Sequence, residues 1–186
     1  MTDSTGPVFY LDLGSPECLL SAERILGVMP VATEWVPVHL NAPATASAID
    51  ALSWTAAARG LQPMRRPEPF PFDAELANRA ATYAKQIGRT VAFAQAALRQ
   101  AYAGGRALDS LDNIVIAASA CEMHPRAVAK AVQTRGVIQA LADATETARL
   151  RGVTSAPAVW IPGLDAFIGD AALQDAADQL AAAVSS

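Results

Sequence analysis

The residues that could carry chemistry stand together at one turn near the start of the chain, Ser15-Pro16-Glu17-Cys18. A serine followed by a proline is typical of a helix start, with Ser15 as the N-cap and Pro16 at the first helical position. The N-terminus of a helix carries unpaired N–H groups and the positive end of the helix dipole. A sulfur anion at this turn would therefore be stabilised, and a cysteine there would have a lowered pKa.

The same turn argues against a dithiol mechanism. Disulfide exchange needs a thiolate and a second thiol that resolves the mixed disulfide. The hydroxyl of Ser15 forms no disulfide, and Cys18 stands about one helical turn further on, where the partner cysteine is normally the more buried. Cys18 is then either a small buried hydrophobe or a lone reactive thiol. Glu17 is either a favourable charge for the helix dipole or a general acid or base.

The composition is that of a compact, helix-rich domain. Of the 186 residues, 52% are hydrophobic and 17% are charged, so the chain can bury a core without disulfide or metal support. The formal net charge is −4 and no run of Lys or Arg follows a phosphate backbone, so we expect no nucleic-acid partner. Cys18 and Cys121 match no zinc spacing, and we expect no metal. The absence of a signal-peptide pattern and of a long apolar run predicts a cytoplasmic protein without a membrane span.

The element that must position the turn is a βαβ unit. Residues 8–13 are apolar and β-branched or aromatic, as in a central strand, and a helix follows over residues 16–27. A second strand is predicted over residues 33–40, where Pro37 favours an edge position. The following stretch shows no strand pattern and is predicted to be helical. Its helices are expected over residues 48–59, 74–87, 90–102, 109–121 and 125–133.

Strands return at the end of the chain. A helix over residues 136–150 precedes a strand at 158–161, a turn at 162–165 and a second short strand at 166–168. Asp170 is interpreted as the cap of a last helix. The order is therefore βαβ, a helical block, and αββα. A helical block inserted into a sheet domain can cover the functional edge of the sheet.

Two segments resemble a known family. Residues 9–20, Phe-Tyr-Leu-Asp-Leu-Gly-Ser-Pro-Glu-Cys-Leu-Leu, resemble the strand–turn–helix of DsbA-like proteins, and still more that of 2-hydroxychromene-2-carboxylate isomerases and kappa-class glutathione transferases, in which a Ser-Pro pair stands at this turn. Residues 152–159, Gly-Val-Thr-Ser-Ala-Pro-Ala-Val, resemble the segment that holds the cis-proline of the thioredoxin fold, and residues 167–173 resemble the closing motif of the isomerase and kappa families.

The resemblance implies an α/β thioredoxin fold with an all-helical insertion between the βαβ and αββα halves. The core would comprise residues 1–40 and 136–186, and the insertion residues 41–135. The implied activity is that of an isomerase or thiol transferase acting on a small aromatic substrate with glutathione or another low-molecular-weight thiol, and the chain would form a homodimer. Ser15 would position the sulfur of this thiol, and the backbone of Ala156, aimed by Pro157, would clamp it.

The candidate site residues are Ser15, Glu17 and Cys18 for catalysis, and Pro16, Ala156, Pro157, Gly169 and Asp170 for cofactor binding. The sequence departs from the family pattern at Glu17, where an aromatic residue is usual. This departure matters because a carboxylate near a thiolate raises the pKa of the thiol. The sequence also departs at Asp170-Ala171, where a polar residue followed by Asp would hold the γ-glutamyl end of glutathione.

Three functional hypotheses stay open on the sequence. The first is the thiol-dependent enzyme. The second is a thioredoxin-fold protein with a degenerate site that binds a small molecule or a protein without redox turnover. The third is a single-cysteine redox protein that acts through Cys18. In each case an apolar pocket between the insertion and the sheet is a hypothesis, and its candidate lining residues are Trp54, Met64, Phe70 and Phe72. His39, at the end of the second strand, is a candidate to face the cleft.

Overall fold

The computed structural model describes residues 6–40 and 44–184, which fold as a four-stranded sheet with helices around it. The predicted element order is confirmed throughout this range. The chain begins with β1 (Val8–Leu11), α1 (Glu17–Val28) and β2 (Glu34–Pro37), and ends with α7 (Arg135–Leu150), β3 (Ala158–Trp160), β4 (Phe167–Ile168) and α8 (Leu173–Val184). Between the two parts lie α2 (Ala46–Ala58), α3 (Glu75–Gln86), α4 (Thr90–Tyr102), α5 (Leu111–Ser119) and α6 (Pro125–Ala131).

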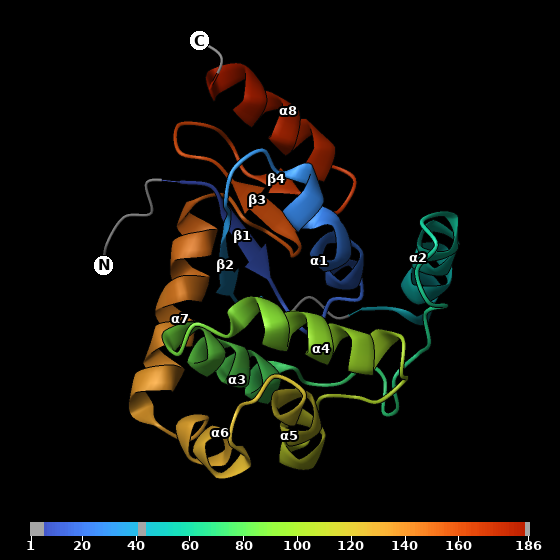
Figure 1. The fold of residues 1–186 in the computed structure, drawn as a ribbon, viewed down its shortest axis with the longest axis vertical. Coiled ribbons are helices and arrows are strands. Elements are labelled where there is room, and N and C mark those ends of the chain that lie inside the picture. Colours follow the sequence, from blue (N-terminus) through green and yellow to red (C-terminus); the bar gives the residue numbers. More distant parts are fainter. Residues whose placement is uncertain (1–5, 41–43, 185–186) are drawn as a thin grey trace.

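The sheet has the strand order β2-β1-β3-β4, so β1 is central and β2 lies at an edge. β1 pairs in parallel with β2, as the helical crossover between them requires, and antiparallel with β3. Pro37 stands on the edge strand, as predicted from its missing N–H. Figure 1 shows α7 along one side of the sheet and α1 with α8 along the other. This strand order is that of the thioredoxin fold that the resemblance implies.

The period of two along the strands divides the core between the two faces of the sheet. Phe9 and Trp35 are opposite each other on β1 and β2, and their rings meet edge to face with centroids 4.9 Å apart. Tyr10 and Val36, one residue further along each strand, therefore project from the other face, toward α7. All four residues of β1 are buried, which explains why its sequence is apolar throughout instead of alternating.

The helical block packs against the end of the sheet and shares its core. α3 and α4 contact each other and β2, and α4 also packs on α1. The buried face of α3 is built from alanines, which let the helix approach its neighbours closely; these are Ala77, Ala80, Ala81 and Ala84. Among the described residues, no helix is both long and apolar enough to cross a membrane.

The α2 helix stands apart from the rest of the block (Figure 1). Trp54 on this helix has an exposed fraction of 81%. The hypothesis that Trp54 lines an apolar pocket is therefore wrong, because its side chain faces solvent. Met64 is buried, and Phe70 and Phe72 are partly buried against the core, so these three are packing residues.

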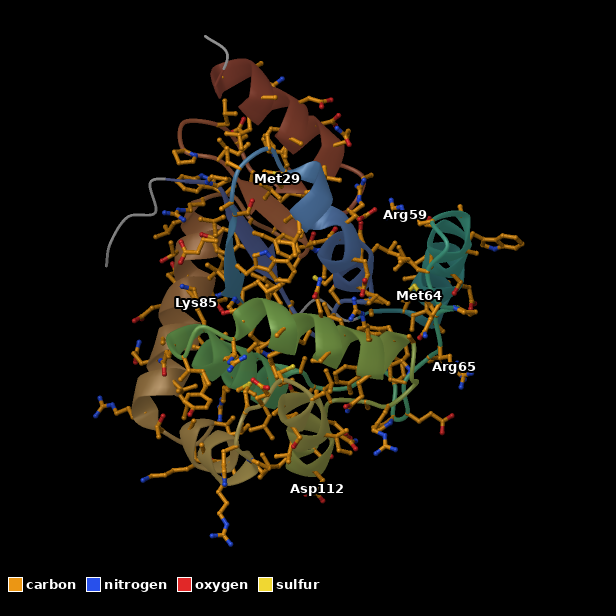
Figure 2. The ribbon with its side chains drawn as sticks, in the orientation of Figure 1. Met29, Arg59, Met64, Arg65, Lys85 and Asp112 are labelled. Carbon is orange, nitrogen blue, oxygen red and sulfur yellow. The ribbon has the colours of Figure 1, made fainter. Side chains whose placement is uncertain are left out.

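A buried carboxylate ties α2, α1 and the start of α8 together. The two oxygens of Asp170 accept hydrogen bonds from Ser21 (2.9 Å) and Arg24 (3.2 Å) of α1 and from Arg59 (2.6 Å), the residue that ends α2. Figure 2 shows Arg59 between α2 and α1. Burial alone would raise the pKa of Asp170, but the hydrogen bonds from Arg59 and Ser21 and the charge of Arg24 outweigh burial and hold this pKa below its ordinary value.

This cluster predicts an acid-sensitive contribution to stability. Because the pKa of Asp170 is lower in the folded chain, the carboxylate stabilises the fold above its unfolded pKa of about 4 and loses this effect as the pH falls through the folded pKa. We expect Asp170→Asn to lower the free energy of unfolding by about 2 kcal/mol at neutral pH, since it leaves two partly buried guanidinium groups without an anion. Denaturant titration at neutral pH and at about pH 3 should show a smaller difference between variant and wild type in acid.

The matched control is Asp165→Asn, which alters an exposed aspartate in the turn between β3 and β4. It should leave the free energy of unfolding within about 0.5 kcal/mol of the wild-type value. An Asp170→Asn effect that is equally large at both pH values would contradict the assignment of a lowered pKa.

Candidate functional site

The turn between β1 and α1 is shaped by a buried aspartate. Asp12 follows the last residue of β1, and its carboxylate accepts hydrogen bonds from the N–H of Gly14 (2.9 Å), the side-chain amide of Asn78 (2.8 Å) and the N–H of Leu40 (2.9 Å). The oxygen of the same Asn78 amide accepts from the N–H of Leu13 (2.9 Å). Asp12 and Asn78 thus connect the ends of β1 and β2 to α3 and fix the path of the turn that leads to Ser15.

Sequence reasoning missed both of these residues. The available signal was Asp12 itself, because an aspartate that directly follows a fully apolar strand needs buried hydrogen-bond donors. The partner from α3 lies 66 positions away, and its identity could not be read from local patterns.

Ser15 lies against the proline segment from the far end of the chain. Its Oγ donates a hydrogen bond to the carbonyl oxygen of Ala156 at 2.7 Å, across 141 positions of sequence. The Ala156–Pro157 peptide bond is cis. This contact follows from the sheet, because Ala158 pairs with Tyr10 and residue 156 then lies beside the turn that follows β1.

The interpretation of Ser15 as a helix cap is wrong. Pro16 occupies the N-cap position of α1, and the helix begins at Glu17. No side chain makes a capping hydrogen bond at this end of the helix. The hydroxyl of Ser15 is directed across the turn to Ala156 instead of back to the N–H groups of α1. Of the first N–H groups, those of Cys18 and Leu19 donate to the carbonyl oxygens of Ser15 and Pro16. The N–H of Glu17 and the positive end of the helix dipole are therefore what this turn offers to a ligand.

Ala156 offers one further hydrogen-bond donor. The carbonyl of Ala156 is engaged by Ser15, whereas its N–H donates to no acceptor within residues 6–40 and 44–184. A backbone N–H beside a serine hydroxyl and a helix N-terminus can bind an anionic or strongly accepting atom. This is the chemistry that the arrangement supports.

Cys18 points into the core behind the turn. Its exposed fraction is 0%, and its sulfur accepts a weak hydrogen bond from the N–H of Asp12 at 3.5 Å. Burial raises the pKa of the Cys18 thiol far above its usual range. Hydrogen bonds from the N–H of Asp12 and the side chain of Ser15 oppose this only in part, and the negative charges of Asp12 and Glu17 add to it. Cys18 is therefore a neutral thiol at physiological pH, and the arrangement does not activate it as a nucleophile.

Glu17, Gly169 and Asp170 meet next to the turn. The Oε1 atom of Glu17 accepts a hydrogen bond from the N–H of Asp170 at 2.7 Å. Gly169 has a φ of +89°, and a Cβ atom there would lie 3.1 Å from the same oxygen, so this position needs glycine both for its backbone and for space. The interpretation of Asp170 as a helix cap is wrong, since its carboxylate is bound by Ser21, Arg24 and Arg59.

These contacts test the fit of glutathione. The resemblance implies that the segment around Asp170 binds the γ-glutamyl end of glutathione. In this chain the N–H of Asp170 is bound by Glu17, and both carboxylate oxygens are bound by residues of the protein. The groups that would hold the γ-glutamyl end are therefore already satisfied, and glutathione does not fit in the family manner. The features that would receive a sulfur atom, at Ser15 and the start of α1, are present.

One cluster carries metal-ligand atoms. The ligand atoms of His39, Asp73 and Glu75 lie within 4.8 Å of one another. Both carboxylates already have partners, because Glu75 accepts from Arg79 and Asp73 accepts from the N–H of Glu75 at 2.8 Å. The Nε2 atom of His39 faces Asp73 at 4.0 Å, and its Nδ1 atom lies 3.4 Å from the amide nitrogen of Asn78. Asp73 is largely exposed. We assign no metal to this cluster. His39 is connected through Asn78 to Asp12, so it lies near the turn without contacting Ser15.

Three comparisons describe what the chain is similar to. Among solved structures, a 2-hydroxychromene-2-carboxylate isomerase has a TM-score of 0.76 at 16% identity, with 96% of this chain and 94% of that chain covered. A probable DsbA oxidoreductase from Streptomyces coelicolor has a TM-score of 0.75 at 19% identity, with 93% and 88% covered. The cytosolic disulfide reductase DsbM from Pseudomonas aeruginosa, in a structure with GSH, has a TM-score of 0.66 at 14% identity, with 94% and 98% covered. No curated protein sequence matches the chain.

At these identities the structural likeness shows the fold alone. The sequence itself matches the family model of the DSBA-like thioredoxin domain over residues 8–181, which is nearly its whole length. This chain therefore belongs to the DsbA-like thioredoxin domain family, as the resemblance of its first turn and its proline segment predicted.

Proposed function

We propose that the chain is an enzyme that binds a low-molecular-weight thiol at Ser15 and uses it, without disulfide exchange, in isomerase or thiol-transfer chemistry on a small aromatic substrate. The observation that carries the proposal is the 2.7 Å contact between the Ser15 hydroxyl and the Ala156 carbonyl. It fixes a hydroxyl beside the start of α1, opposite the segment that precedes Pro157. A bound thiol would supply a nucleophilic sulfur atom.

The residues of this site would act by binding and orienting. The hydroxyl of Ser15 can turn its proton from Ala156 toward an anion, because a charged acceptor forms a stronger hydrogen bond than a carbonyl does. The N–H of Glu17 and the helix dipole favour negative charge at the same point. Glu17 opposes that charge, but its carboxylate is held by the N–H of Asp170. Cys18 takes no part, because it is buried and neutral.

The preferred thiol is one that does not depend on a γ-glutamyl group. Glu17, Arg24 and Arg59 satisfy the polar groups around Asp170, so this part of glutathione would find no partner. A shorter or less charged thiol has no γ-glutamyl group, so its binding does not need the polar groups around Asp170. We also place the activity in the cytoplasm, where thiols are kept reduced.

A thermal-shift titration tests the proposal. N-acetylcysteine at about ten times its Kd should stabilise the fold by about 1.4 kcal/mol, which raises the Tm by about 4 °C for a chain of this size. Glutathione should give no larger shift at the same concentration, because its γ-glutamyl end gains no partner. S-methyl-N-acetylcysteine, which has no ionisable thiol, should give no shift.

Ser15→Ala should abolish the shift with N-acetylcysteine, and the matched control Ser119→Ala, at an exposed position on α5, should keep it. If no thiol in the series shifts the Tm of the wild type, the proposed thiol dependence is wrong. If glutathione gives the largest shift, the conclusion that Asp170 does not receive its γ-glutamyl end is wrong.

The buried state of Cys18 gives a second prediction. In native protein with Cys121→Ser, iodoacetamide should modify Cys18 at least about a hundredfold more slowly than it does in denaturant, because the thiol is both inaccessible and protonated. Mass spectrometry of the alkylated chain measures both rates. Rapid modification in the native state would support the single-cysteine redox hypothesis and contradict this reading of the site.

A degenerate binding protein without turnover is the second candidate. It is favoured by one observation, which is that Ser15 and Glu17 satisfy their hydrogen bonds within the protein. It predicts that Ser15→Ala leaves partner binding almost unchanged, whereas the thiol-dependent enzyme predicts loss of activity in this variant.

A further inference from the structure

A cavity lies on the other face of the sheet from α1. Its volume is about 400 Å³, and it is an open cavity lined by β1, β2, α3 and α7. The side chains of Val8 and Val36 form an apolar floor, and Ala140 and Ala144 of α7 form the facing wall. This volume is at the lower end of the range for small-molecule sites.

The sequence explains why this space is open. Val8, Tyr10 and Val36 all project toward α7, because they share one face of the two strands. The residues of α7 that face them are Ala140 and Ala144, whose side chains are too short to fill the gap. The rim is polar and comes from both α3 and α7, and Figure 2 shows Lys85 of α3 beside β2 and α7.

The charges of the described residues that line the cavity balance. Lys85 forms an ion pair with Glu34 at 2.6 Å. Arg151 and Asp143 add one charge of each sign to the lining. A ligand with a net charge would therefore gain little from this site and would lose its own hydration. The balance favours an uncharged ligand.

The lining of the cavity includes one buried hydroxyl group whose oxygen is held in place, that of Tyr10. Tyr10 has an exposed fraction of 1%, and its hydroxyl oxygen accepts a hydrogen bond from Nη1 of Arg151 at 2.8 Å. The guanidinium group of Arg151 is held over the ring of Trp160, with its carbon 3.6 Å from the ring centroid. The oxygen of Tyr10 is thus fixed, and its own proton meets no acceptor in the described part of the chain. Burial raises the pKa of Tyr10, so the proton stays on the oxygen at physiological pH.

We propose that this cavity is a second ligand site, which binds a small uncharged molecule that is mostly apolar and carries one carbonyl or similar acceptor. The apolar part would cover Val8 and Val36, and the acceptor would take the hydrogen bond of Tyr10. A buried hydroxyl proton without an acceptor is costly, so a ligand that supplies the acceptor gains from it. The site is separated from Ser15 by the sheet, and the proposal does not depend on the proposed function.

Binding of acetophenone tests the proposal, measured by saturation-transfer NMR competition with the full chain. Ethylbenzene has the same size without an acceptor, and benzoate has a similar size with a negative charge. We expect acetophenone to bind roughly fivefold more tightly than ethylbenzene, the factor that corresponds to one ordinary hydrogen bond, and more tightly than benzoate.

Tyr10→Phe should remove this preference by weakening acetophenone binding roughly fivefold without changing the affinity for ethylbenzene. Ala144→Leu should abolish binding of both by filling the cavity, even if Tyr10→Phe fails to fold. Its matched control, Ala142→Leu, places the same side chain at an exposed position of α7 and should bind like the wild type.

Several outcomes would overturn the proposal. These are no binding of acetophenone, equal binding of ethylbenzene, tighter binding of benzoate, or binding that persists in Ala144→Leu. Loss of acetophenone binding in Ser15→Ala would place the ligand at the turn on the other face and would equally refute a site at Tyr10.

Discussion

The antiparallel pairing of β3 with β1 is the constraint on which both proposed sites depend. Because Tyr10 is opposite Ala158, the residue two positions earlier, Ala156, lies beside the turn that follows β1 and meets Ser15. The same pairing fixes which side chains of β1 face α1 and which face α7. One register therefore sets both the hydroxyl at the mouth of α1 and the phenol in the cavity behind the sheet, and a shift by one residue would exchange the two faces.

Replacement of a cysteine by Ser15 changes what the rest of the turn can do. A thiolate at that place would use the helix dipole, and Cys18 would resolve its disulfides. With a hydroxyl there, Cys18 is left as a core residue whose burial suppresses ionisation. The helix dipole is unchanged by the substitution, so the turn still favours an anion but must obtain it from a ligand. The absence of a cysteine pair at this turn is therefore compatible with the proposed thiol site.

Sequence patterns predicted the elements well, because apolar periodicity and the Gly and Pro breaks are local signals. They also predicted that Ser15 and Ala156 belong to one site, through the resemblance of two short motifs. They failed where a side chain had two possible uses: Ser15 and Asp170 have the residue types of helix caps, yet both bond to distant groups. The hydrogen bond from Asn78 to Asp12 and the exposure of Trp54 depend on how the helical block packs, and no local sequence pattern indicates them.

The cluster around Asp170 shows how the departures from the family pattern are connected. Glu17 brings a negative charge to the start of α1, where it would raise the pKa of a bound thiol. Its carboxylate is held instead by the N–H of Asp170, and the carboxylate of Asp170 is in turn balanced by Arg24 and Arg59. The two carboxylates and the two guanidinium groups balance each other in charge, so the region has no net charge that would attract a ligand. In the proposed function, selection of a ligand at this turn would then depend on Ser15, the helix dipole and the backbone of Ala156, which would recognise a sulfur atom and not the molecule that carries it.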